Sequence, residues 1–277
     1  MFNFLSQIFN PLKTMQIKSD EDIEKMRLSC ELVSKVHELM AKELKLGVTG
    51  LYLDKLAEEF IRDHNALPSF KGYNGFPYTL CVSPNYTVVH GFPNDKPFTE
   101  KDIVSIDCGV FAQGFHGDCA YTYCFSQVND ETKKLLKVTK ESLNLAIKMV
   151  KAGVKTGDLG FEIQTYCEKN GYSVVRELVG HGVGKNLHEA PDVPNFGKKG
   201  KGTMLKKNVV IAIEPMINMG KKEVKTEKDD WTINTVDKKM SAHFEHSVKV
   251  GLDKSEALTR HDWCEEAIKL NKDLILI

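Results

Sequence analysis

The sequence predicts an α+β fold made of two similar halves, with helices flanking a curved antiparallel sheet. Helical spacing of apolar residues runs from Asp20 to about Leu46, and a second such segment follows Thr49. A similar helix pair recurs about a hundred residues later, over 131–151 and 153–171. β-rich runs broken by glycine-containing turns follow each pair. The pattern of a helix pair followed by strands therefore occurs twice, which indicates an internal duplication.

The composition is that of a globular enzyme with no charge bias toward a partner. The chain has 277 residues, 42% hydrophobic and 27% charged, which is enough for a large core. Lys+Arg and Asp+Glu both number 38, so no overall positive field attracts nucleic acid or anionic lipid. Seven cysteines without CxxC spacing favour free thiols in a reducing cytoplasm. No apolar run approaches the ~20 residues of a membrane span, and the first residues lack signal-peptide features.

The first two helices carry start signals. Ser19 or Asp20 caps the first, and Thr49 precedes the second. The apolar spacing predicts which face of each helix is buried. The predicted stripes are Ile23, Met26, Leu32, Val33, Val36, Leu39 and Met40 in the first helix and Leu53, Leu56, Ala57, Phe60 and Ile61 in the second.

The duplication is visible in two short segments. GVTGLYLDKLAEEF, from Gly47, and GVKTGDLGFEIQTYC, from Gly153, read as copies of one turn-plus-helix unit. A single duplication is not a solenoid, which needs at least three repeats. It predicts two α+β halves related by a pseudo-twofold axis, with sheet after each helix pair.

A hairpin is predicted around the turn Ala112-Gln113-Gly114, in DIVSIDCGVFAQGFHGDCAYTYCF. Centring the turn between residues 112 and 113 pairs Asp107 with Asp118. Cross-strand Cβ atoms ~5 Å apart bring like charges together at a cost, so such a pair favours a cation between them. The alternative is a slipped register with two solvated aspartates, and on the hairpin alone the two interpretations weigh equally.

Three further elements add side chains of the same chemical class. In VGHGVGKNLHEAP, His181 lies between two glycines that allow close backbone approach, and His188 follows seven residues on. NVVIAIEPMI places Glu214 at the end of an apolar strand, where a charge needs a partner. In MSAHFEHSVKV, Glu245 falls on the polar face of a period-2 strand. The alternative interpretations, without a functional role, are that His181 is a polar surface residue and that Glu245 lies on an exposed strand face.

Together these residues form a set rich in oxygen donors with one imidazole. Such a set is suited to Mn, Fe, Co or Zn and is unlike the ligand set of a thiolate zinc site. It matches a site in which carboxylates hold two divalent ions ~3.5–4 Å apart and activate a shared water. The set is Asp107, Asp118, His181, Glu214 and Glu245.

Four segments of the chain resemble those of a known family. SIDCGVFAQGFHGD, VGHGVGKNLHEAP, AIEPM and SAHFEHSV are similar, in order and separation, to the metal-ligand segments of the type I methionine aminopeptidases of peptidase family M24. The resemblance covers roughly residues 17–253 and implies the pita-bread fold. It implies that these five residues bind two divalent ions (Co, Mn, Fe, Zn or Ni), with Asp118 and Glu245 bridging. It also implies catalytic roles for His90, His188 and Glu214.

The resemblance implies a metalloprotease that removes the initiator methionine of proteins, prefers a small second residue and uses a two-metal-activated water. Residues 215–244 leave no room for the insertion of type II enzymes, and few residues precede the first helix, unlike the X-Pro enzymes. The alternatives are an X-Pro aminopeptidase or dipeptidase, or a non-catalytic pita-bread binding module. His116 matches no ligand position, so we interpret it as structural.

A methionine pocket is also implied by the resemblance. Aromatic and soft side chains suit an unbranched thioether, although the same residues also read as plain core. At positions 70 and 187 the chain departs from the Cys and Phe of bacterial relatives. The implied lining is Phe70, Tyr73, Phe76, Cys81, Leu187 and Trp231, with His90 and His188 contacting substrate.

The expected organisation is an N-terminal extension over 1–16, a catalytic domain over 17–253 and a C-terminal tail over 254–277 that packs on or follows this domain. The expected partners are peptides with N-terminal methionine, nascent polypeptides and the ribosome. No nucleic-acid or membrane partner is expected. We expect a cytoplasmic monomer that acts in protein maturation.

Overall fold

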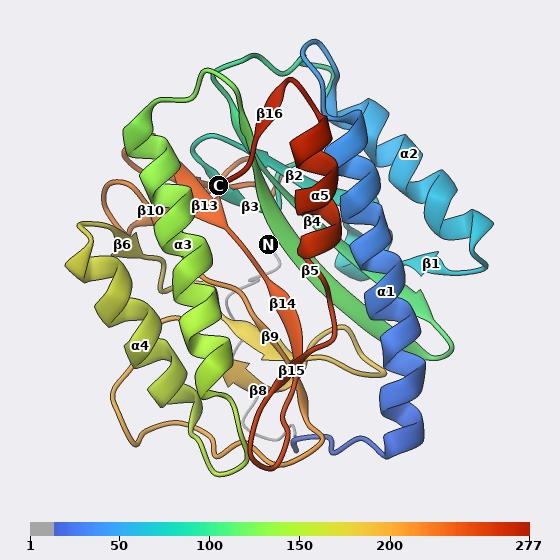
Figure 1. The fold of residues 1–277 in the computed structure, drawn as a ribbon, viewed down its shortest axis with the longest axis vertical. Helices are drawn as coiled ribbons and strands as arrows, with labels where there is room; N and C mark the ends of the chain where they lie inside the picture. The colour runs from blue at the N-terminus through green and yellow to red at the C-terminus, as the bar shows by residue number, and fades with distance from the viewer. Residues whose placement is uncertain (1–13) are drawn as a thin grey trace.

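The computed structural model describes residues 14–277, and the predicted extension 1–16 lies mostly outside this range. Helices α1 (Asp20–Glu43), α2 (Gly50–Asp63) and α5 (Asp262–Leu270) gather on one side, and α3 (Asp130–Met149) and α4 (Thr156–Lys169) on the other (Figure 1). Strands lie between the two groups of helices. No helix of residues 14–277 is long and apolar enough to cross a membrane.

The strands form four sheets, and every pairing among the described strands is antiparallel. The prediction of an α+β fold with antiparallel sheet flanked by helices is therefore confirmed. The larger sheets have five strands each, β1-β4-β5-β16 with β2 on β4, and β15-β14-β9-β7-β8; the smaller ones are β13-β10-β6 and β11-β12-β3. The bounds are β1 Leu67–Pro68, β2 Leu80–Pro84, β3 Thr87–Val89, β4 Ile103–Ala112, β5 Phe115–Phe125, β6 Ser173–Val174, β7 Gly180–Gly182, β8 Glu189–Val193, β9 Val210–Ile213, β10 Met216–Asn218, β11 Val224–Thr226, β12 Ile233–Thr235, β13 Ser241–His243, β14 His246–Lys249, β15 Glu256–Ala257 and β16 Leu274–Ile275.

The start signals of the first helix pair work as predicted. Ser19 caps α1 in a capping box with Asp22, so each side chain accepts a hydrogen bond from the other residue's N–H. Thr49 caps α2 by accepting from the N–H of Tyr52. Most of the predicted stripe is buried, while Leu39 and two α2 residues, Leu56 and Phe60, are partly buried against the core.

The second helix pair repeats the first. Gly47 and Gly153 both take a positive φ, and a helix starts three residues after each of them. Thr49 and Lys155, each two residues after its glycine, make isolated β-bridges to the chain beyond their helices. These matched turns are the structural counterpart of the repeated sequence segments.

The last residues of the chain pack against the first helix and the long hairpin. Helix α5 lies along α1, and β16 pairs with β5 through Leu274 and Phe125 (Figure 1). Cys264, Ala267 and Ile268 supply the buried face of α5. All seven cysteines are buried free thiols.

Candidate active site

The hairpin β4–β5 carries the first two acidic residues of the site. Its turn is Gln113-Gly114, with both φ angles positive (50° and 84°), as a two-residue primed turn requires. Ala112 pairs with Phe115, so Asp107 lies opposite Ala120 and not opposite Asp118. The predicted pairing is wrong by two residues because the turn lies one residue further along. A shift of two keeps a side chain on the same face, so both aspartates still face the site.

Three carboxylates of the site hold oxygens that have no hydrogen-bond partner. These are Oδ1 of Asp107, Oδ1 of Asp118 and Oε1 of Glu245, and Asp118 and Glu245 are only 4% and 2% exposed. Burial, followed by the neighbouring carboxylates, raises the pKa of each of the three well above its usual range. Such a group of buried acids is stable in its ionised form only beside a positive charge.

His181 reaches the same cluster from β7. Its Nδ1 lies 3.0 Å from the carbonyl of Gly182, so Nδ1 donates a hydrogen bond there and Nε2 is the nitrogen that faces the carboxylates. Nε2 lies 3.5 Å from Glu214 Oε1 and 3.9 Å from Asp118 Oδ2. A Cβ on Gly180 would lie 2.3 Å from a backbone oxygen, and one on Gly182 2.4 Å. The two glycines therefore serve close backbone approach, as expected.

Glu214 and Glu245 arrive from two paired strands. Glu214 follows the buried strand β9, and its carbonyl accepts a hydrogen bond from Asn195 at 2.9 Å. Glu245 stands between β13 and β14, and its N–H donates to the carbonyl of Ala120. The predicted continuous strand with a polar face is wrong here: the strand breaks at 244–245, and residues 241–248 are buried on both faces.

The side chains that converge here fit a divalent cation. One donor atom each from Asp118, His181 and Glu245 lie within 4.8 Å of one another, and all three residues are buried. Carboxylate oxygens and a neutral imidazole are ligands of divalent metals, and unpaired buried carboxylates need such a charge. A metal held by Asp118 and Glu245 would neutralise the like-charge repulsion that raises their pKa values.

Metal binding should therefore stabilise the protein less as the pH falls. In the metal-free protein the raised pKa values of Asp107, Asp118 and Glu245 favour folding below the unfolded values of 3.8 and 4.5, and this contribution is lost as the pH rises through the folded values. A bound cation requires the ionised groups. We expect the Tm difference between loaded and metal-free protein, measured by calorimetry, to shrink from about pH 7.5 to about pH 5. A constant difference would contradict this assignment.

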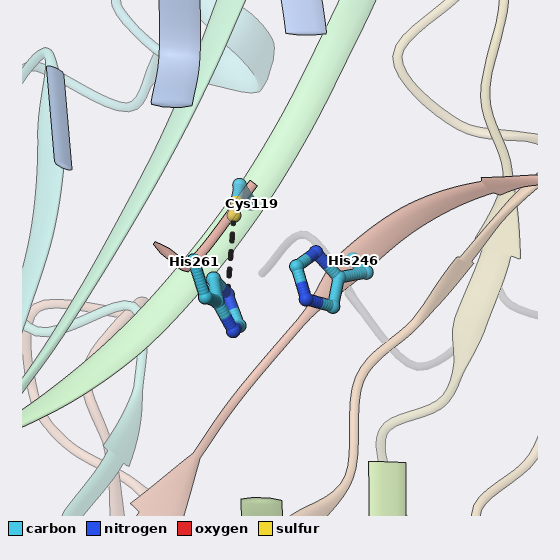
Figure 2. Close-up of side chains that lie close together, drawn as sticks. All are labelled: Cys119, His246 and His261. Atoms are coloured by element: carbon cyan, nitrogen blue, oxygen red, sulfur yellow. Dashed lines mark hydrogen bonds between the residues drawn. The ribbon is translucent and has the colours of Figure 1, made fainter. Parts of the chain in front are cut away.

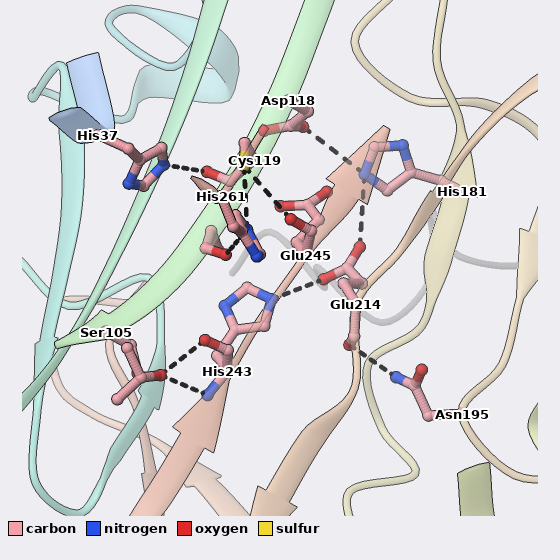
Figure 3. A network of polar contacts seen from close by, with 12 residues as sticks. His37, Ser105, Asp118, Cys119, His181, Asn195, Glu214, His243, Glu245 and His261 are labelled. Carbon is pink, nitrogen blue, oxygen red and sulfur yellow. Dashed lines mark hydrogen bonds and ion pairs between the residues drawn. The ribbon is translucent and has the colours of Figure 1, made fainter. Parts of the chain in front are cut away.

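His243 belongs to the site, although the sequence analysis gave it no role. Its Nε2 is buried without a hydrogen-bond partner and lies 3.5 Å from Glu214 Oε2. Figure 3 shows Glu214 between His181 and His243. A signal was present, because His243 and Glu245 are two residues apart in SAHFEH, the spacing that puts side chains on one face of a strand.

Two further histidines lie at the mouth of the site. Nδ1 of His188 is 2.9 Å from the Tyr73 hydroxyl, and the His188 ring lies 4.1 Å from that of His181. His90 has a positive φ of 57°, and burial lowers its pKa to about 4, so it is neutral at pH 7. The Trp231 ring lies edge-on to His90, with centroids 6.3 Å apart.

One cavity of about 510 Å³, open to solvent, joins the acidic cluster to an apolar pocket. Phe70, Phe76, Cys81 and Leu187 are at most 8% exposed and form its apolar end. The structure thus brings together all the residues that the sequence analysis placed in the site. The lining residues are Phe70, Tyr73, Phe76, Cys81, His90, Asp107, Asp118, His181, Leu187, His188, Glu214, Trp231 and Glu245. Two apolar neighbours were not anticipated, Tyr78 and Phe92.

His116 does not line this cavity. Its Nδ1 lies 2.8 Å from the hydroxyl of Ser69, and burial lowers its pKa to about 4. Its backbone N–H donates to the carbonyl of Gly184. These contacts agree with a structural role.

Cys119, His246 and His261 form a second buried cluster (Figure 2). The thiol of Cys119 donates to the carbonyl of Glu245 at 3.3 Å. Nε2 of His261 lies 3.1 Å from the carbonyl of Ala120, so this nitrogen carries a proton, and Nδ1 of His246 bonds a threonine hydroxyl. Because these residues already pair with one another, with the backbone or with the Thr259 hydroxyl, we interpret this cluster as support for the strands that carry the carboxylates.

Comparison with known proteins agrees with this geometry. Residues 24–251 match the model of metallopeptidase family M24. The chain is 45% identical to a methionine aminopeptidase of Clostridium perfringens over 88% of this chain and 98% of the relative. A methionine aminopeptidase structure from Rickettsia prowazekii superposes with a TM-score of 0.87 at 39% identity, covering 89% of this chain and 100% of that one. One from Thermotoga maritima gives 0.88 at 41%, covering 90% and 100%.

Proposed function

The chain belongs to metallopeptidase family M24, and we propose that its cavity removes the N-terminal methionine from polypeptides. The observation that carries the proposal is a cluster of unpaired buried carboxylates that shares one cavity with an apolar pocket. The carboxylate cluster serves metal-dependent hydrolysis, and the apolar pocket selects an unbranched apolar side chain. A binding module would have no use for the carboxylate cluster. Enzymes that select proline at the second residue of the substrate have no need of the apolar pocket.

Asp107, Asp118, His181, Glu214 and Glu245 would hold two divalent ions, and Asp118 and Glu245 would be the ligands shared by both. Bound ions would supply Lewis-acid chemistry, lowering the pKa of water and polarising the scissile carbonyl. The unpaired oxygens of Asp107, Asp118 and Glu245 support the assignment. Nε2 of His243 lies 3.5 Å from Oε2 of Glu214, while His181 faces the other oxygen of this carboxylate.

We assign to Glu214 the role of accepting the proton of the attacking water. Its two oxygens face His181 and His243, each at 3.5 Å, and its side chain keeps 13% exposure toward the cavity. It is therefore the acidic group best placed to receive a proton and return it to the leaving amine.

His188 and His90 would stabilise the oxyanion that develops on the carbonyl oxygen. When the Tyr73 hydroxyl donates to Nδ1 of His188, the ring carries its proton on Nε2 and can donate it to substrate. His90 remains neutral at pH 7 because its pKa is about 4. The apolar end of the cavity, with Phe76 and Leu187, would hold the methionine side chain.

In the cell, we propose, the enzyme acts as a cytoplasmic monomer on nascent polypeptides, with the ribosome as its partner. Nascent chains begin with methionine, the side chain for which the pocket is shaped.

A peptide that begins Met-Gly and carries a second, internal methionine tests the activity. We expect metal-loaded protein to release the first methionine only, because the substrate must present a free α-amine beside the buried carboxylates. Mass spectrometry of the products reads the result, and the N-acetylated peptide is the control. Cleavage at the internal methionine, or of the acetylated peptide, would contradict an aminopeptidase.

A further inference from the structure

We propose that Lys18 is a positioning residue for His188 and acts through Glu189; this inference rests on the proposed function. Nζ of Lys18 lies 2.5 Å from Oε2 of Glu189, and the two side chains are 5% and 4% exposed. The partners are 171 positions apart in sequence. A buried ion pair is costly to break on one side only, because the remaining charge has no partner.

Lys18 is fixed before it meets Glu189. Its backbone N–H donates to the carbonyl of Asn208 at 2.9 Å, and its Nζ also donates to the carbonyl of Gln16. The next residue, Ser19, caps α1. The ammonium group is therefore held by the start of a long helix, which makes it a rigid anchor.

Glu189 ties together the short turn that presents His188. Its second oxygen, Oε1, accepts a hydrogen bond from the N–H of Asn186 at 3.2 Å, and its backbone pairs with Gly182 in β7. Leu187 and His188 lie between the two ends of this bond. Holding Glu189 thus holds the backbone of His188 against the strand that carries His181.

The ion pair packs directly on bare backbone at Gly184. A Cβ there would lie 2.4 and 2.6 Å from the carboxylate oxygens of Glu189 and 2.6 Å from Cε of Lys18. The N–H of Gly184 donates to the carbonyl of Asn186, and its carbonyl accepts from the N–H of His116. The pair and the turn therefore form one packed unit.

His188 itself is the exposed member of this unit. Its neighbours Leu187 and Glu189 are buried, while its ring stands out toward the cavity beside Tyr73. Because its backbone is fixed on both sides, the ring of His188 keeps its place beside Tyr73 and His181. A displacement of about 1 Å in such a group costs roughly 100-fold in rate.

Replacing Lys18 with methionine tests the proposal, since it removes the charge and keeps the stem. We expect kcat on a Met-Gly peptide to fall about 10- to 100-fold, with KM and metal content unchanged, because the lost contact acts in the transition state. His188→Ala sets the ceiling, about 100- to 1,000-fold. Lys25→Met, which breaks an exposed ion pair on α1, is expected to leave kcat unchanged.

A purely structural role for the pair predicts other results. Ile268→Ala, a buried change in α5 remote from the cavity, controls for loss of stability. Lys18→Met/Glu189→Gln leaves no unpaired charge, so it is expected to recover much of the kcat that Lys18→Met loses. Equal losses of kcat in Lys18→Met and Ile268→Ala, or no recovery in the double variant, would overturn the proposal.

The side-chain ¹⁵N signals of His188, assigned with His188→Ala, give a readout that does not depend on activity. We expect them to shift in Lys18→Met and to stay in place in Lys25→Met; unshifted signals overturn the inference. Should Lys18→Met not fold, Glu189→Gln carries the same readouts, with smaller expected changes. If wild-type protein fails to cleave the Met-Gly peptide, the proposed function falls, while these signals still decide the positioning.

Discussion

Replacing Asp118 or Glu245 with alanine is expected to abolish peptide hydrolysis and to lower the number of metal ions bound. Each offers a buried oxygen without a hydrogen-bond partner, and their donor atoms lie within 4.8 Å of each other and of His181. Loss of Lewis-acid stabilisation worth several kcal/mol corresponds to at least about 1,000-fold in kcat. Calorimetric titration with the metal and elemental analysis give the stoichiometry.

The stability of the metal-free variants separates loss of metal from misfolding. Burial and then the charge of Asp118 raise the pKa of Glu245, and burial and then the charge of Glu214 raise the pKa of Asp118, because like charges share a buried site. Removing either should therefore leave the metal-free protein at neutral pH at least as stable as wild type, apart from the small cavity created. His116→Ala, outside the cavity, is the activity control. Undiminished binding of two metal ions by both variants would remove these residues from a bridging role.

The second large effect is expected in the choice of the first residue. The pocket lined by Phe70, Phe76, Cys81 and Leu187 is apolar and nearly closed. Norleucine, which keeps the length and unbranched shape of methionine, should be accepted, and β-branched valine should be disfavoured. One methylene in such a pocket is worth only ~1–3 kcal/mol, so alanine, several heavy atoms shorter, should lose orders of magnitude in kcat/KM.

The second residue should act in the opposite direction. His90 and His188 line the same cavity as the carboxylates, and we expect them to crowd the second residue of the substrate, so that glycine, alanine and serine pass and lysine or phenylalanine is rejected. The kcat/KM values of Met-Gly and Met-Lys peptides, measured under equal metal loading, read this preference. Equal values for the two would contradict crowding by the histidines.

Local rules predicted the helices and failed at the hairpin register. Ser19 and Thr49 caps follow from residues a few positions apart, which a sequence displays directly. The register depends on which two residues form the turn, and these residues must adopt a positive φ. Gln113 adopts a positive φ, although glutamine seldom does. The error did not remove the site, because a shift of two residues preserves the face.

The contacts missed at the site are those between distant segments. The sequence analysis gave Lys18 no role, since nothing near it in sequence reveals its buried partner Glu189. Helix α5 was missed although its spacing was readable, with Cys264 and Ile268 on one face. His261 just before it supports the carboxylate strands through Ala120, a contact that requires the folded tail.

The kcat/KM values of the metal-reconstituted protein on a mixed peptide panel test most directly whether this family M24 chain removes N-terminal methionine. The panel pairs Met-Gly and norleucine-Gly peptides with Val-Gly, Ala-Gly and several X-Pro peptides. We predict efficient release of methionine and norleucine, with alanine orders of magnitude lower and X-Pro bonds resistant. Efficient cleavage of Ala-Gly peptides, or of X-Pro peptides regardless of the first residue, would contradict it.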